Sequence, residues 1–157
     1  MPDALLTLSE ARAMTTGYRQ LCKDIENDVR QSGRSVLCIG AEENLLPFAY
    51  TIGNALKGLP ELLIIGTIKG ELLNDLSEKM LDRGDAFDDG ELVSLGGKFP
   101  VKIITADDGR AQRDFTIQAG QYLGREDYAV QQVLVCDRSG HYPDDPQCQA
   151  PYSLSPC

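Results

Sequence analysis

Apolar runs separated by polar connectors dominate the middle of the chain and predict a β-sheet there. Residues 48–66 read FAYTIGNALKGLPELLIIG, in which two apolar runs, each followed by a glycine, flank a polar connector that contains Gly58 and Pro60. This pattern is typical of two buried neighbouring strands that a short loop joins. We therefore predict that residues 47–53 and 61–67 form adjacent strands, which defines the middle of the fold.

A long amphipathic helix is predicted before this region. Apolar residues recur at intervals of three and four from Ala11 to Val29, so that they lie on one face of a helix. Thr7 and Glu10 fit a capping box at its start, and Ser32 and Gly33 end it.

The remaining segments complete the order α-β-β-β-α-β-β-α-β. Because short loops join consecutive strands, we expect those strands to be antiparallel. The sequence therefore predicts the α+β class, with a single mixed, mainly antiparallel sheet of about six strands covered by three helices. We expect residues 1–137 to form one domain, including an N-terminal helix over 1–33, and residues 138–157, with four prolines, to form an extended tail. The later helices are predicted at 70–84 and about 110–123, and the other strands at 35–40, 93–95, 101–105 and 130–136.

Three short motifs resemble those of a known family. They read AYTIG at 49–53, G-x-P-E-L at 58–62 and D-x-x-G-x-x-P at 137–143. With the elements around them, they make residues 20–145 similar to the bacterial proteins of domain-of-unknown-function family 4262. The resemblance implies a shared fold and brings no activity with it. Two positions differ from the pattern that members often show, since Leu59 replaces a histidine and Asp144 replaces a tryptophan.

Composition and charge narrow the classes of function. At 157 residues, with 42% hydrophobic and 25% charged residues, the chain has the composition of one soluble globular domain. The net charge of −9 repels phosphate backbones and the chain has no tryptophan for base stacking, so we expect no nucleic-acid binding. We also expect no membrane partner and a cytoplasmic location, because the N-terminus lacks a cationic segment and no apolar run is long enough to span a bilayer. Five cysteines without a C-x-x-C pair do not indicate a disulfide framework.

No motif for a nucleotide or a metal is present. The glycines that follow the strands form neither G-x-G-x-x-G nor a P-loop. His141 is the sole histidine, and the nearby Asp137, Asp144, Asp145 and Cys148 match no known spacing of metal ligands. We therefore predict no metal site and no cofactor.

Polar residues at one end of the predicted sheet form a candidate ligand-binding site. Tyr50 and Thr51 lie near the end of one central strand and Glu61 at the start of the next, so we expect them to lie close together. A carboxylate beside an apolar strand is partly desolvated, which raises its pKa and suits it to proton transfer or cation binding. Asp137, after the last strand, completes the candidate site. The structural alternatives are that Glu61 caps a backbone amide or pairs with Lys57 or Arg34, and that Asp137 forms an Asx turn.

An acidic band forms the second candidate site. Residues 71–91 contain eight acidic residues against Lys79 and Arg83. Such a band attracts a positively charged partner, although a solvated helix face and loop give the same pattern. The candidate partner-binding residues are Glu71, Asp75, Glu78, Asp82, Asp85, Asp88 and Asp89.

Three hypotheses for function follow. The leading one is a non-enzymatic interaction or ligand-binding domain whose acidic surface (71–91) binds a basic partner protein. The first alternative is a small enzyme or small-molecule pocket at the sheet end around Tyr50, Thr51 and Glu61. The second alternative is a homodimer formed through the N-terminal helix.

Overall fold

The computed structural model describes residues 5–7, 16–40, 46–66, 70–97, 99–106, 109–137 and 139–147. Its elements, in chain order, are β1 (Leu5–Thr7), α2 (Thr16–Ser32), β2 (Ser35–Gly40), β3 (Phe48–Ile52), the 3-10 helix η1 (Asn54–Lys57), β4 (Glu61–Ile65), α3 (Gly70–Arg83), β5 (Leu92–Val93), β6 (Val101–Ala106), α4 (Arg110–Asp114), α5 (Ile117–Leu123) and β7 (Val130–Leu134).

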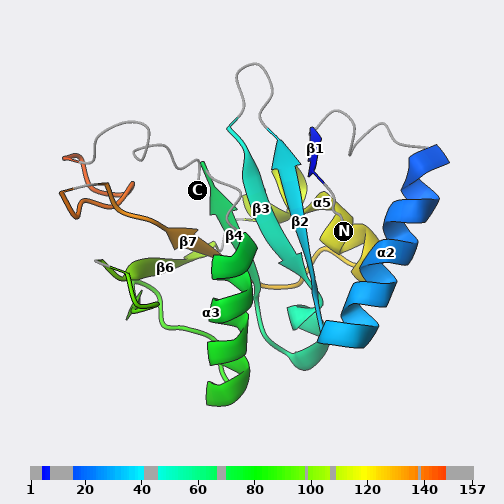
Figure 1. Ribbon diagram of the computed structural model, residues 1–157, viewed down its shortest axis with the longest axis horizontal. Helices are drawn as coiled ribbons and strands as arrows, with labels where there is room; N and C mark the ends of the chain where they lie inside the picture. Colours follow the sequence, from blue (N-terminus) through cyan, green and yellow to red (C-terminus); the bar gives the residue numbers. More distant parts are fainter. Residues whose placement is uncertain are drawn as a thin grey trace.

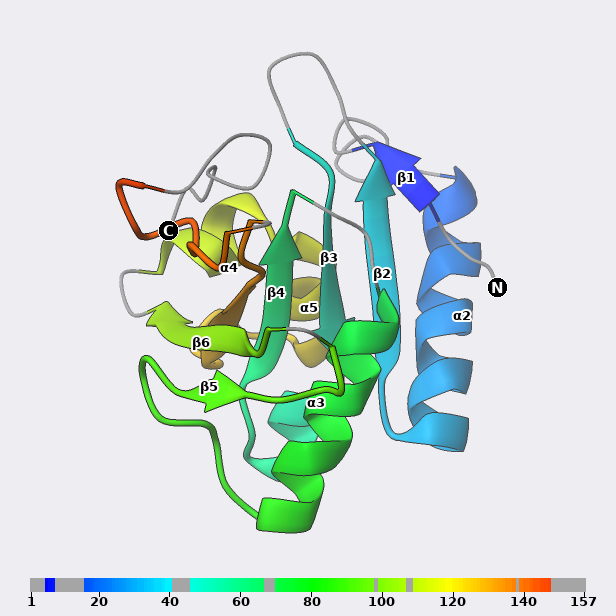
Figure 2. The same cartoon turned by 60° about the vertical axis from the view of Figure 1, so that its left-hand side comes forward.

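In the part of the chain that the structure describes, seven strands form one central sheet in the order β1-β2-β3-β4-β7-β6-β5 (Figure 1). The β1–β2 and β4–β7 pairs are parallel and the other neighbouring strands are antiparallel. Among the described strands, β5 and β1 lie at the two edges, and α3 lies on one face of the sheet over β2, β3 and β4 (Figure 2). The predicted α+β class and mixed sheet are confirmed. The predicted pairing of the two central strands is also confirmed, because Phe48 pairs with Ile65 and Tyr50 with Leu63.

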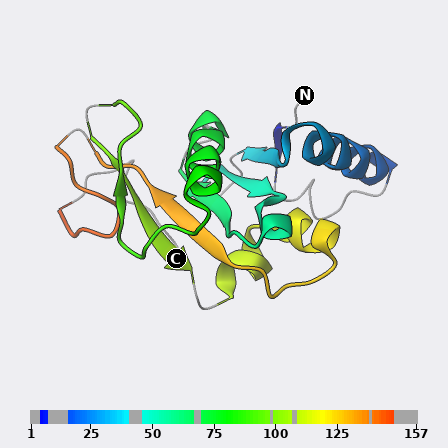
Figure 3. The ribbon, with the colours of Figure 1, turned by 90° about the horizontal axis from the view of Figure 1, so that it is seen from below.

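Helices cover both faces of the sheet, because side chains alternate between its faces along each strand. On one face, residues of α2, α4 and α5 pack against Leu37, Phe48 and Tyr50. On the other face, α3 packs against Ala49 and Leu62. Figure 3 shows α3, in green, on one side of the sheet and α4 and α5, in yellow, on the other. The sheet therefore has a hydrophobic core on each side.

The predicted N-terminal helix differs from the structure at its start. Leu5–Thr7 form a strand parallel to β2, so the helix predicted over 1–33 is wrong at its start, where pairing with the sheet edge replaces local helix formation. The predicted capping box and the first turns of that helix fall largely in residues 8–15, outside the described residues.

The helix predicted over 110–123 is two shorter helices. The chain leaves helical geometry at Thr116, whose φ of −88° and ψ of 46° are not those of an α-helix. Its amide and hydroxyl both donate to the Ala111 carbonyl. This side-chain bond competes with the helical pattern, as threonine hydroxyls commonly do.

Part of the predicted tail lies against the domain. The Tyr142 hydroxyl donates to the Pro100 carbonyl at 2.7 Å, and the Lys102 ammonium lies 2.7 Å from Asp144 Oδ2. Residues 139–147 thus contact the start of β6, whereas residues 148–157 lie outside the described residues.

Candidate functional site

The Glu61 carboxylate is the centre of a buried polar cluster at the end of β3 and β4. Its side chain has 0% exposure. Oε1 accepts hydrogen bonds from the Thr51 hydroxyl at 2.7 Å and the Asn54 amide at 3.1 Å. Oε2 accepts from the amides of Gly53 at 2.9 Å and Ala55 at 3.1 Å. The carboxylate therefore holds the first amides of η1, which have no partner within that helix.

The donors around Glu61 match its charged form. The Thr51 oxygen already accepts the Leu62 amide at 2.9 Å, so its proton is directed to Glu61. The other three donors are backbone amides. If Glu61 were protonated, its own O–H group would be a further donor pointing at one of these N–H groups, with no acceptor between them. Burial raises the pKa of the Glu61 carboxyl, and these hydrogen bonds oppose the rise because they stabilise the anion.

Helix α3 packs against this polar cluster and contributes one of its side chains. The Asn54 side-chain amide donates to Ser77 Oγ of α3 at 2.9 Å, and both residues are fully buried. Next to them, the Arg34 Nε donates to Asn74 Oδ1 at 3.0 Å, and its guanidinium forms an ion pair with Glu78. We call Thr51, Asn54, Glu61 and Ser77 the Glu61 cluster.

Tyr50 does not join the Glu61 cluster. Adjacent residues of a strand point to opposite faces, so Tyr50 faces α5 while Thr51 faces α3. The Tyr50 hydroxyl donates to Gln118 Oε1 of α5 at 2.6 Å and accepts from the Gln118 amide at 3.3 Å. Burial raises the pKa of this hydroxyl, which therefore stays protonated.

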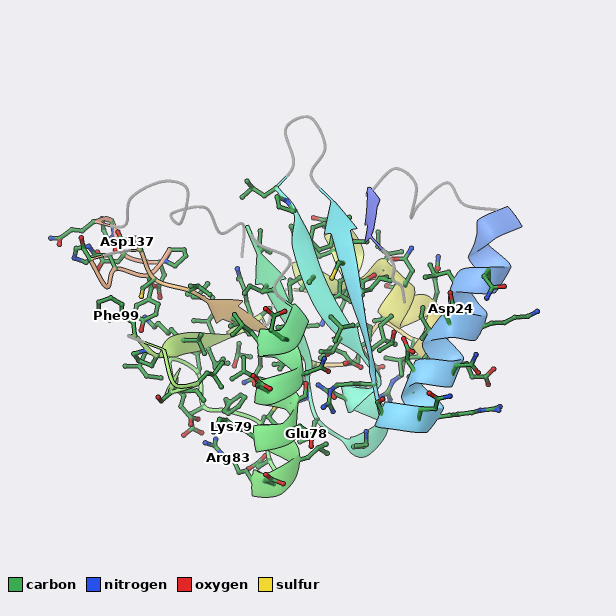
Figure 4. The ribbon with its side chains drawn as sticks, viewed as in Figure 1. Asp24, Glu78, Lys79, Arg83, Phe99 and Asp137 are labelled. Atoms are coloured by element: carbon green, nitrogen blue, oxygen red, sulfur yellow. The ribbon has the colours of Figure 1, made fainter. Side chains whose placement is uncertain are left out.

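Asp137 lies after the other end of β7, because β7 starts beside Glu61 and runs parallel to β4. Its Oδ1 accepts the amides of Ser139 at 2.8 Å and His141 at 2.9 Å, as in an Asx turn. Figure 4 places Asp137 near Phe99, far from Arg83 at the end of α3. Of the four candidate residues, the structure thus brings together only Thr51 and Glu61. Among the described residues, no group of three or more His, Cys, Asp and Glu side chains is arranged to hold a metal ion.

The acidic residues of 71–91 fall into two groups. Glu78 is paired with Arg34, and Glu91 with Arg83. The Arg83 guanidinium lowers the pKa of the Glu91 carboxyl to about 2. The others are exposed and form no ion pair with any residue that the structure describes; we call them the acidic face, which comprises Glu71, Asp75, Asp82, Asp85, Asp88 and Asp89.

A hollow of ≈ 380 Å³ opens beside the connector between β3 and β4. We call it the Pro60 hollow, and its lining includes Leu59, Pro60, Phe87, Arg125, Tyr128 and Gln131. None of these residues was predicted from the sequence as a site residue. One signal was present, since Gln131 and Gln132 interrupt the otherwise apolar last strand, and a buried polar pair in a central strand requires dedicated partners.

The motifs of the sequence now have structural explanations. Glu61 of G-x-P-E-L caps η1, and Asp137 and Gly140 of D-x-x-G-x-x-P form a turn in which Gly140 has a φ of 87°.

Among the described helices, none is long and apolar enough to cross a membrane. No curated protein and no solved structure matches the chain. The model of one family, described as domain of unknown function (DUF4262), matches residues 28–149, and the chain therefore belongs to that family.

Proposed function

We propose that this protein is a non-enzymatic domain that binds a positively charged partner protein through its acidic face. The observation that carries the proposal is the pairing pattern of residues 71–91. Two carboxylates there have cationic partners, while the other six are exposed and the segment contains one further basic residue, Lys79. Unpaired surface charge of one sign raises the encounter rate with an oppositely charged partner.

The arrangement on α3 supports a protein partner. Glu71, Asp75 and Asp82 are spaced by four and seven residues, so they lie along one side of the helix. The helix is about 21 Å long at 1.5 Å per residue, and the acidic face continues into the loop that follows it. A segment of a partner with several Lys or Arg side chains fits a surface of this extent.

The Glu61 cluster favours this proposal over catalysis at the sheet end. A general base needs a free lone pair within reach of its substrate. Both oxygens of Glu61 are occupied by donors of the protein itself, and the side chain has no exposure. The carboxylate is therefore better suited to holding the connector than to proton transfer.

Binding of a fluorescent oligolysine peptide tests the proposal. Asp85→Asn/Asp88→Asn removes two charges from the acidic face, and Asp24→Asn/Glu26→Gln removes two from the exposed side of α2. We expect the first variant to bind the peptide several-fold more weakly at low salt and the second to bind like the wild type. High salt should weaken binding of the wild type, because exposed charges are screened.

Equal loss in both variants would overturn the proposal, because it would show attraction to net charge alone. Binding that does not depend on salt would also overturn it.

We also propose a cytoplasmic location. Among the described cysteines, Cys22 and Cys136 form no disulfide bond. Free thiols are the usual state in a reducing compartment. Mass spectrometry of the alkylated protein from cells tests this, since we expect Cys22 and Cys136 to be labelled after denaturation without reduction.

A further inference from the structure

The Pro60 hollow lies where five segments of the chain meet. They are the connector after β3, the loop after α3, the end of β6, the segment after α5 and the start of β7. Its volume of ≈ 380 Å³ is within the range of sites for small molecules, which is about 300–1,000 Å³. It does not include any residue of the acidic face.

Side-chain hydrogen bonds, which are not part of the helix and strand hydrogen-bond patterns, hold the walls of the hollow in place. The Gln131 side chain donates to the Phe87 carbonyl at 2.7 Å and accepts the Phe87 amide at 3.3 Å. These two hydrogen bonds hold the backbone of Phe87 in place, and the Phe87 ring also lies 4.9 Å from the Arg83 guanidinium. The opposite wall is fixed because the Tyr128 hydroxyl donates to the Thr116 carbonyl at 2.8 Å.

The third wall is the connector that carries Leu59 and Pro60. Its start is held by Glu61, as described above, and the Leu59 amide donates to the Asn54 carbonyl at 3.1 Å. The Glu61 amide in turn donates to the Ala129 carbonyl at 2.9 Å, which joins this wall to the segment before β7. The hollow is therefore formed before any ligand arrives, and a preformed site loses less entropy on binding.

Among the described residues that line the hollow, Arg125 is the one with a cationic side chain. Arg125 and Asp127 both line the hollow, and the Arg125 Nε lies 3.5 Å from Asp127 Oδ1, where both side chains are exposed. Such an exposed pair contributes little, so the guanidinium is available to a ligand. A carboxylate matches the paired N–H groups of a guanidinium. Glu126 and Asp127 beside it disfavour a ligand with several negative charges, such as a nucleotide.

We propose that the Pro60 hollow binds a small molecule with an apolar body and one carboxylate group. The body lies against Leu59, Pro60 and Phe87, and the carboxylate binds Arg125. This site is independent of the proposed partner surface, so either can fail without the other.

Titration with 2-naphthoate, followed by amide NMR shifts, tests the proposal, with the neutral 2-naphthamide as the matched probe. We expect naphthoate to shift the amides of Gly58, Ala86 and Ala129 in a saturable way and to bind about tenfold more tightly than naphthamide, which corresponds to about 1.4 kcal/mol. Arg125→Gln should remove that difference, whereas Arg30→Gln on α2 should leave it unchanged.

A second variant separates the apolar part from the charge. Ala129→Phe places a large ring in the hollow and should weaken both probes, provided that its NMR spectrum shows a folded protein. The proposal is overturned if the two probes bind equally well to the wild type, or if naphthoate shifts none of the lining amides. Shifts confined to the neighbouring hollow around Ile117 and Gln121 would also overturn it.

Discussion

Thr51 and Glu61, ten residues apart on neighbouring strands, meet as donor and acceptor across 2.7 Å in a site closed to solvent. Each of the two also bonds backbone amides, Thr51 that of Leu62 and Glu61 those of Gly53, Asn54 and Ala55. The pair therefore replaces the backbone partners that the chain lacks where it leaves β3 and enters β4. The pair holds the connector between β3 and β4, and this connector forms one wall of the Pro60 hollow.

Glu61→Gln should destabilise the fold strongly. The new side-chain amide would face backbone N–H groups, and each buried donor left without a partner costs about 1–3 kcal/mol. We expect a loss of about 3 kcal/mol in the free energy of unfolding, measured by urea denaturation with circular dichroism. Glu126→Gln, at an exposed position, should change it by less than about 0.5 kcal/mol. A fully stable Glu61→Gln would contradict the capping role.

Tyr50→Phe should remove one buried hydrogen-bonding group and keep the ring. The side-chain oxygen and the amide of Gln118 would then lose their common partner. We expect a loss of about 1–2 kcal/mol in unfolding free energy, with Tyr122→Phe on the same helix α5 as the matched control of smaller effect. Equal losses of unfolding free energy in the two variants would show that the hydrogen bonds of the Tyr50 hydroxyl do not stabilise the fold more than an ordinary tyrosine hydroxyl does.

Gly53→Ala should be among the most disruptive glycine substitutions. Gly53 has a φ of 127°, and an added Cβ would lie 2.7 Å from the Gly33 carbonyl oxygen and 2.9 Å from Arg34 Cα. Gly84 also has a positive φ, of 79°, but its added Cβ would meet nothing within 4 Å. We expect Gly84→Ala to cost about 1 kcal/mol from backbone strain alone and Gly53→Ala clearly more, as measured by thermal unfolding. Similar melting temperatures for the two variants would contradict this packing.

The Glu91–Arg83 pair should make stability fall in acid. The pKa of Glu91 is lowered from 4.5 to about 2 in the folded protein, so its contribution is fully present above pH 4.5 and is lost as the pH falls towards 2. Glu91→Gln removes that contribution. We therefore expect the wild type to be more stable than the variant at pH 6, and the difference to shrink over that acidic range in urea denaturation. A difference that does not depend on pH would rule out the ion pair as its cause.

The sequence predicted the contacts that arise from neighbouring segments. The apolar runs on either side of Gly58 led to the pairing of β3 with β4, because a short connector leaves antiparallel packing as the direct solution. The same reasoning brought Thr51 and Glu61 together. The Asx turn of Asp137, which was the structural alternative for that residue, is likewise a local feature.

Contacts across the whole chain could not be predicted in this way. Tyr50 and Gln118 are 68 positions apart, and no spacing in the sequence relates them. The expectation that Tyr50 joins Glu61 failed because consecutive strand residues face opposite layers. Arg125 and Phe87 line one hollow only because β7 and then β6 follow β4 in the sheet, an order that short-range patterns do not contain.

The parallel pairing of β4 with β7 also determines when the protein can fold during synthesis. Glu61 pairs with Val130 and Ile64 with Val133, so residues 66–129 must be made before the centre of the sheet can close. Pairing of such distant segments is slow, because a long loop must be closed first. A ribosome-bound chain that stops before Val130 would therefore present the edge of β4 opposite β3 to chaperones, and full protection of the β4 amides from hydrogen exchange would come only after β7 is released.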